Sequence, residues 1–120
     1  MKNNMDTQPP KKVAGLYSLE LLREFSRGKE DFVDKMIRVF KEETPKSIQL
    51  LKEHYSKYEY KKVSDVAHKM RTSIDMLEIK TIQNDIRSIE NFAREQKNLD
   101  QLPDLINRVT ATCELVITLL

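Results

Sequence analysis

The sequence predicts an all-α fold: an antiparallel four-helix bundle with a short additional helix near the N-terminus. Three observations support this prediction. Apolar residues recur at three- and four-residue spacing along most of the 120-residue chain. The chain has only 2 glycines and 4 prolines whereas 33% of its residues are charged, a composition that favours long helices joined by short connections. No segment of useful length alternates between apolar and polar residues, as a half-buried strand would.

The first residues of the chain differ in composition from the rest. Residues 1–15 are mostly polar and include two consecutive prolines, Pro9 and Pro10, so we expect a disordered leader. The remaining residues, 16–120, are enough for one domain with a real core and too few for two.

Five helices are expected in this domain. Ser18 can cap a short helix, and Gly28 can end it. A long helix should begin at the acidic residues after Lys29 and be either kinked or divided at Pro45. After a break near residues 56–59, a third helix should run from about Tyr60 to Leu77. The last two helices carry apolar stripes formed by Ile82, Ile86, Ile89 and Ala93, and by Leu102, Leu105, Ile106, Val109, Cys113, Val116 and Leu120.

The most informative residue is His68, in the middle of the third helix. The buried face of this helix is marked by apolar residues at helical spacing: Val63, Val66, Ala67, Met70, Ile74 and Leu77. Because a helix turns about 100° per residue, His68 lies roughly 140–150° from the centre of that stripe and should face solvent. The neighbouring cations Lys69 and Arg71 favour the neutral, nucleophilic imidazole and can hold an anion beside it.

A docking surface is expected around this imidazole. Thr72 lies one turn after His68 on the same exposed face. The helical wheel also places Met76 and Ile79 toward the His68 side, where an exposed apolar pair beside a reactive group favours contact with a partner. Together with Asp75, these residues form the expected docking surface.

Composition disfavours several other classes of function. The net charge is +2, from 21 basic and 19 acidic residues, which is too near neutral for a protein that binds a nucleic-acid backbone. The two histidines and the one cysteine show no spacing typical of a metal site, and the isolated glycines form no phosphate-binding loop. We therefore expect no metal ion, no nucleic-acid partner and no hydrolase activity.

The same features predict where the protein resides. Cys113 falls on an apolar stripe and has no partner for an internal disulfide, which suits a reducing cytoplasm. The sequence has no secretory signal and no apolar run approaching the roughly 18 residues that span a bilayer. We expect a cytoplasmic protein without a membrane partner.

The segment Ala67-His68-Lys69-Met70-Arg71 resembles the motif of the histidine-phosphotransfer (HPt, or Hpt) domains of bacterial phosphorelays. In that family the histidine follows an alanine, and after it come a variable residue, an apolar residue, a lysine and a glycine. The resemblance extends over roughly residues 16–119. Arg71 stands in place of the lysine, whereas Thr72 and Glu78 stand where glycines are common.

The resemblance implies a place in two-component signal transduction. His68 would accept a phosphoryl group from a receiver-domain aspartyl phosphate and pass it to another receiver, with Arg71 and secondarily Lys69 stabilising the phosphate. The module would be a phosphocarrier, not an enzyme, and have no cofactor of its own, because Mg²⁺ is expected on the partner receiver. The implied partners are receivers of response regulators or hybrid histidine kinases, and we expect the carrier to be a monomer.

Two alternatives stay open. Because Thr72 replaces a glycine thought to leave room for the partner, the chain could be a degenerate, non-phosphorylated helical adaptor that docks a receiver or kinase. A helical protein associated with nucleic acid is the other, and the even charge balance disfavours it.

Overall fold

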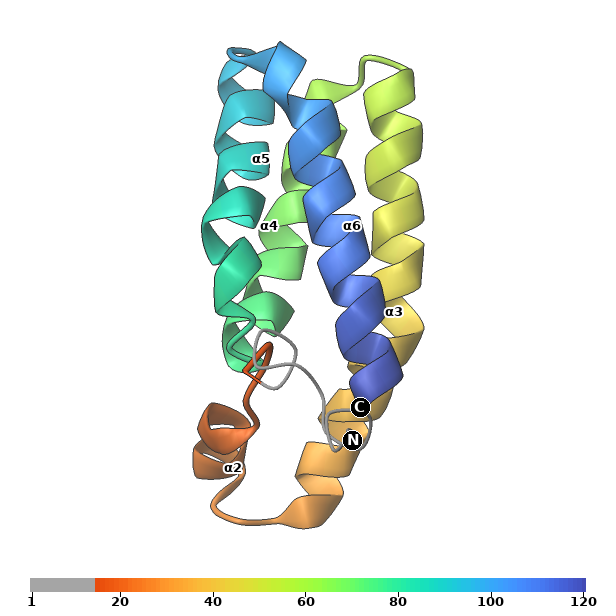
Figure 1. Cartoon of the computed structure of the whole chain (residues 1–120). Helices are drawn as coiled ribbons and strands as arrows, with labels where there is room; N and C mark the ends of the chain where they lie inside the picture. Colours follow the sequence, from red (N-terminus) through yellow and green to blue (C-terminus); the bar gives the residue numbers. More distant parts are fainter. Residues whose placement is uncertain (1–14) are drawn as a thin grey trace, which may run out of the picture.

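Four long helices stand side by side in the computed structural model, which describes residues 15–120 (Figure 1). They are α3 (Glu30–Ser56), α4 (Tyr60–Met76), α5 (Gln83–Glu95) and α6 (Leu102–Leu119). A short helix, α2 (Glu20–Ser26), precedes them, and the 3₁₀ turns η2 (Lys80–Ile82) and η3 (Leu99–Gln101) lie before α5 and α6. The described residues contain no strand, so the predicted all-α fold is confirmed. Except for Gly15, the expected disordered leader lies outside the described residues.

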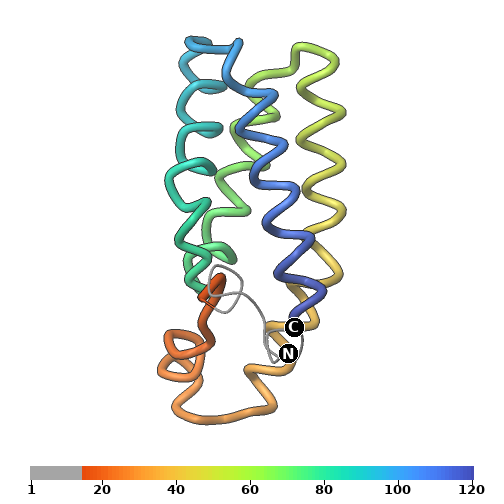
Figure 2. The backbone as a smooth tube through the Cα atoms, viewed as in Figure 1, coloured from red at the N-terminus to blue at the C-terminus, as the bar shows by residue number. Residues whose placement is uncertain are grey.

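The four long helices form an antiparallel bundle that follows chain order. Each helix packs on the next, and α6 closes the arrangement by packing on α3. The tube in Figure 2 shows the short connections alternating between the two ends of the bundle. The helix α2 lies at one end, beside the first turns of α3, as predicted for the additional helix.

The core is built from the apolar stripes that the sequence predicts. Each long helix contributes residues that are almost completely buried, among them Leu51, Ala67, Ile89 and Val109 at 0% exposure. Full burial of one large aliphatic side chain contributes about 1.5–3 kcal/mol. Because isolated helices of this length are marginal in water, this packing supplies most of the stability that keeps each helix formed.

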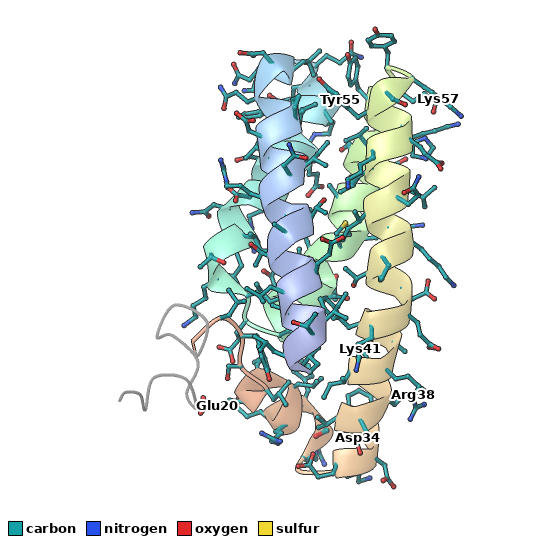
Figure 3. The ribbon with its side chains drawn as sticks, turned by 45° about the vertical axis from the view of Figure 1, so that its right-hand side comes forward. Glu20, Asp34, Arg38, Lys41, Tyr55 and Lys57 are labelled. Carbon is teal, nitrogen blue, oxygen red and sulfur yellow. The ribbon has the colours of Figure 1, made fainter. Side chains whose placement is uncertain are left out.

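The helix α3 is continuous through Pro45, so of the two alternatives expected there, a kink or a division, the division into two helices is excluded. Pro45 has no N–H to donate to the carbonyl of Lys41, but the flanking turns are held by burial of Phe40, Thr44 and Ile48 against the bundle. Figure 3 shows the length of this helix: Asp34, Arg38 and Lys41 lie along its lower half, and Tyr55 and Lys57 mark its upper end.

The helix α4 ends earlier than the helical wheel assumes. Glu78 has a left-handed backbone (φ 50°), and its N–H bonds to the carbonyl of Asp75 while the N–H of Ile79 bonds to that of Ile74. This turn sends Ile79 into the core, where it is 0% exposed. The prediction that Ile79 belongs to an exposed docking surface is therefore wrong, because the 100° step per residue no longer applies beyond Met76.

The segment before α2 is tied to the same end of α4. The backbone N–H of Ser18 donates to the carbonyl of Leu77 at 2.9 Å, and Leu22 of α2 is buried. The hydroxyl of Ser18 accepts a hydrogen bond from the N–H of Glu20 at 3.2 Å. The contact of Ser18 places α2 close to the second half of α4, which carries several of the expected docking residues.

Among the described helices, none has both the length and the apolar character needed to cross a membrane.

Candidate functional site

His68 lies on the exposed side of α4, as its helical spacing predicts. Its side chain is 68% exposed, whereas Ala67 and Met70 on either side of it are buried against the bundle. The apolar stripe of α4 therefore fixes the rotation of the helix, and this rotation presents the imidazole to solvent.

The imidazole is oriented by a carboxylate from the neighbouring helix. Nδ1 of His68 lies 2.8 Å from Oε2 of Glu90 on α5. An ionised carboxylate can only accept hydrogen bonds, so Nδ1 carries the proton in this pair and the lone pair of the neutral ring is on Nε2. The pair thus fixes both the tautomer and the direction of the nitrogen that can act as a nucleophile.

Glu90 is itself nearly buried and held by several donors. Its side chain is 7% exposed, and its other carboxylate oxygen, Oε1, accepts a hydrogen bond from Nη1 of Arg71 at 2.8 Å. Nη1 of Arg94 lies farther away, 3.6 Å from Oε2. The hydroxyl of Ser64 donates to the backbone carbonyl of Glu90 at 3.0 Å and joins α4 to α5 at this point.

These contacts decide the ionisation of Glu90. Burial by itself raises the pKa of the carboxyl, but the hydrogen bonds from Arg71 and His68 outweigh burial and bring the pKa below its ordinary value of 4.5. Glu90 is therefore an anion at neutral pH, and its charge lies directly behind the imidazole.

Sequence reasoning missed Glu90. The residue follows Ile86 by four positions and precedes Ala93 by three, so it lies on the edge of the buried stripe of α5. A carboxylate at a stripe position must find a cationic or N–H partner inside the fold, and that is the sequence feature that could have pointed to it.

The two cations beside His68 have different surroundings. Arg71 is half-buried and faces α5, where it pairs with Glu90. Lys69 is exposed on the opposite flank and lines a hollow of about 200 Å³ between α3 and α4. Arg71 lies three residues after His68 and so neighbours it on the helix surface, whereas Lys69 is the next residue and lies on the other flank.

Two of the expected docking residues share a small apolar hollow. Thr72 is exposed and Met76 half-buried, and both line a hollow of about 40 Å³ together with Leu22 of α2 and Met36 and Phe40 of α3. Asp75 is half-buried, and its Oδ2 accepts a hydrogen bond from Nη2 of Arg87 on α5 at 3.0 Å. The surface beside His68 is therefore formed by α2, α3 and α4, with Ile79 absent from it.

The second histidine has a different setting. Nδ1 of His54 lies 2.8 Å from Oε1 of Glu59 at the connection between α3 and α4, and the histidine side chain is only 20% exposed. Within residues 15–120, no three histidine, cysteine or acidic side chains gather as a metal site would require. Cys113 is buried. This burial is the main cause that raises the pKa of its thiol to about 12, and the negative charge of Glu114 contributes less.

Comparison with known families identifies the domain. The family model of the Hpt domain matches residues 35–118, which is more than half of the chain. The chain belongs to the Hpt family. Hpt domains are phosphocarriers, not enzymes, with a phosphotransfer role in phosphorelays, and they typically interact with receiver domains. The match covers His68, Glu90 and all of α4 and α5, whereas α2 precedes it. Neither the curated proteins nor the solved structures include one that matches this Hpt chain.

Proposed function

We propose that this Hpt domain accepts a phosphoryl group on Nε2 of His68 from an aspartyl phosphate of a receiver domain and passes it to a second receiver. The observation that carries the proposal is the 2.8 Å contact between Nδ1 of His68 and Glu90. This contact keeps the proton on Nδ1, so the exposed imidazole offers its lone pair at Nε2.

The transfer step balances without a general base. The Nε2 lone pair attacks the phosphorus atom, the N–P bond forms, and the bond between phosphorus and the aspartyl oxygen breaks. The electron pair of that bond leaves with the aspartate carboxylate. Nδ1 keeps its proton, so the phosphorylated ring is cationic, and the Glu90 carboxylate lies where it neutralises that charge. Return transfer to a receiver follows the same steps in reverse.

The partner supplies the rest of the chemistry. Mg²⁺ and the acidic cluster that binds it belong to the receiver in this proposal, and the metal neutralises charge on the group in transit. Arg71 and Lys69 add cations from this chain at the phosphoryl oxygens. In this proposal the receiver contacts Thr72, Met76 and Asp75 of α4, and the small hollow beside Thr72, with its mostly apolar lining, forms part of that contact.

Labelling from a phosphorylated receiver tests the proposal. The domain is mixed with a hybrid kinase and ATP, or with a receiver carrying labelled phosphate, and acid-labile label on the domain is measured over time. We expect the wild type to be labelled and His68→Gln to remain unlabelled. His54→Gln is the matched control, because it changes the other histidine and should be labelled like the wild type.

Two outcomes would contradict the proposal. Full labelling of His68→Gln would show that another group is the acceptor. A wild-type domain that binds the receiver but takes up no label would be the non-phosphorylated adaptor described above.

A further inference from the structure

Three donor groups surround the Glu90 carboxylate, and only two of them are hydrogen-bonded to it. Oε1 is bonded to Arg71, while Oε2 lies 2.8 Å from Nδ1 of His68 and 3.6 Å from Nη1 of Arg94. A distance of 3.6 Å is too long for a hydrogen bond, so the Arg94 contact is incomplete. The other terminal nitrogen of Arg94 donates to Oδ1 of Asn91 at 2.7 Å.

Phosphorylation of His68 changes the competition for Arg71. A phosphoryl group brings roughly two negative charges and three strong acceptor oxygens to Nε2. Arg71 is on the same face of α4, its side chain is 35% exposed, and charge-assisted hydrogen bonds to phosphate are among the strongest available to it. The new anion therefore draws Arg71 away from Glu90.

Losing Arg71 leaves Oε1 of Glu90 without its donor, while Oε2 stays paired with Nδ1 of His68. A carboxylate oxygen without a donor is costly in a side chain that is only 7% exposed, because the side chain has given up most of its hydration. Arg94 follows Glu90 by one helical turn on α5, and its guanidinium already lies 3.6 Å from Oε2, so a side-chain movement alone can bring it onto the carboxylate whose Oε1 is vacated. A hollow of about 280 Å³, lined by Arg94 itself and by residues of α4 and α5, gives that side chain room to move.

We propose that Arg94 is a positioning residue that takes over the Glu90 carboxylate when Arg71 turns to the phosphoryl group. The inference rests on the proposed phosphorylation of His68. Arg94 then acts through Arg71: it replaces the donor that Glu90 loses and so frees the guanidinium of Arg71 for the phosphoryl oxygens. By holding Arg71 at those oxygens, it withdraws the electron density that would otherwise help to break the P–N bond, and so lengthens the life of the phosphohistidine.

Hydrolysis of chemically phosphorylated protein tests this role without a receiver. Folded wild type is treated with phosphoramidate, the label on His68 is located by peptide mass spectrometry, and its loss is followed by ³¹P NMR. We expect Arg94→Gln to lose the phosphoryl group about threefold faster than the wild type, an effect of the size that a partly exposed ion pair can exert. Arg94→Lys keeps the charge and should restore most of the lifetime.

A double-mutant cycle separates this role from a general effect of charge. We expect Arg71→Gln to shorten the lifetime, and Arg94→Gln to have no further effect when added to Arg71→Gln, because Arg94 acts only through Arg71. Arg108→Gln is the matched control: Arg108 is 58% exposed against 54% for Arg94 and pairs with Asp85 instead of Glu90, so its variant should behave like the wild type.

Either of two results would overturn the inference: an unchanged lifetime in Arg94→Gln, or an equal loss of lifetime with and without Arg71. The proposed function can fail separately. If a phosphorylated receiver does not label the wild type, the role in transfer is lost, but the phosphoramidate experiment still decides whether Arg94 and Arg71 exchange places.

Discussion

Glu90 and His68 divide the chemistry of the site between two helices. In the proposed mechanism the imidazole on α4 supplies the lone pair, and the nearly buried carboxylate on α5 supplies the charge that a phosphorylated, cationic ring requires. Charge-assisted hydrogen bonds of this kind contribute about 1.5–3 kcal/mol. We therefore expect a substitution at Glu90 to impair the proposed phosphotransfer, although the residue is not the phosphoryl acceptor.

Glu90→Gln should slow phosphotransfer by about one to two orders of magnitude, the rate equivalent of one lost charge-assisted contact. The glutamine oxygen can still accept a hydrogen bond from Nδ1, so the ring keeps its direction while the neutralising charge is lost. Transfer rates from a phosphorylated receiver, with circular dichroism as the control for folding, check this expectation. A wild-type rate would show that orientation alone is enough.

The same substitution should alter the response of the protein to acid. The pKa of Glu90 in the folded protein lies below 4.5, so the stability that its ionised form contributes is complete above that pH and is lost as the pH falls through the folded value. The difference in free energy of unfolding between the wild type and Glu90→Gln should thus be constant at neutral pH and shrink below about pH 4.5. Urea denaturation between pH 3 and pH 7 measures it. A difference that grows in acid would contradict the assignment.

Thr72 should control how closely a partner approaches His68. It is exposed one turn after the histidine and lines the hollow shared by α2, α3 and α4. In-line transfer needs the reacting atoms within about 3–3.5 Å, so Thr72→Phe should leave a folded bundle that transfers poorly. Thr72→Gly should keep or improve transfer at a folding cost of up to roughly 1 kcal/mol. Melting temperatures and transfer rates are measured together, and normal transfer by Thr72→Phe would place the docking surface elsewhere.

At the scale of the helices, periodicity predicted the elements well and their ends less well. The apolar stripe of α4 predicted correctly that His68 is exposed, because the spacing of apolar residues determines which face of a helix is buried. Ile79 was placed wrongly because the left-handed turn at Glu78 ends that rotation, and nothing about a glutamate at this position predicts such a turn. Glu90 escaped prediction for another reason: its partners lie 19 and 22 residues away on a different helix, beyond any local pattern.

The turn after α4 puts a strained backbone at one of the positions where this sequence departs from the Hpt motif. Glu78 occupies a position where a glycine is common, and its φ of 50° is one that glycine adopts without strain. Glu78→Gly should therefore raise the free energy of unfolding by up to about 1 kcal/mol. Denaturant unfolding checks this, and Glu78→Ala is the control that removes the carboxylate but keeps the strain. Equal stability of the two variants would mean that the charge, not the backbone, matters at this position.

At the scale of the whole molecule, Cys113 reports on the integrity of the core. Its thiol is completely buried, and its pKa is raised from 9.0 to about 12, so at neutral pH it is both inaccessible and protonated. Iodoacetamide should modify it only in molecules that have unfolded. Alkylation measured across a urea titration should rise together with the loss of helical circular dichroism. Rapid alkylation of the folded protein would reveal local opening of α6.

The pairing of residues across α4 and α5 has a consequence for the transfer of the proposed activity to another protein. A peptide or designed helix carrying only Ala67-His68-Lys69-Met70-Arg71 would reproduce the histidine motif but lack the carboxylate that sets the tautomer. The smallest portable unit is instead a pair of helices held in register, in which a buried glutamate on one meets a histidine and an arginine on the other. Screening sequences for such two-helix pairs, instead of the short motif alone, would separate competent carriers from helices that merely contain a histidine.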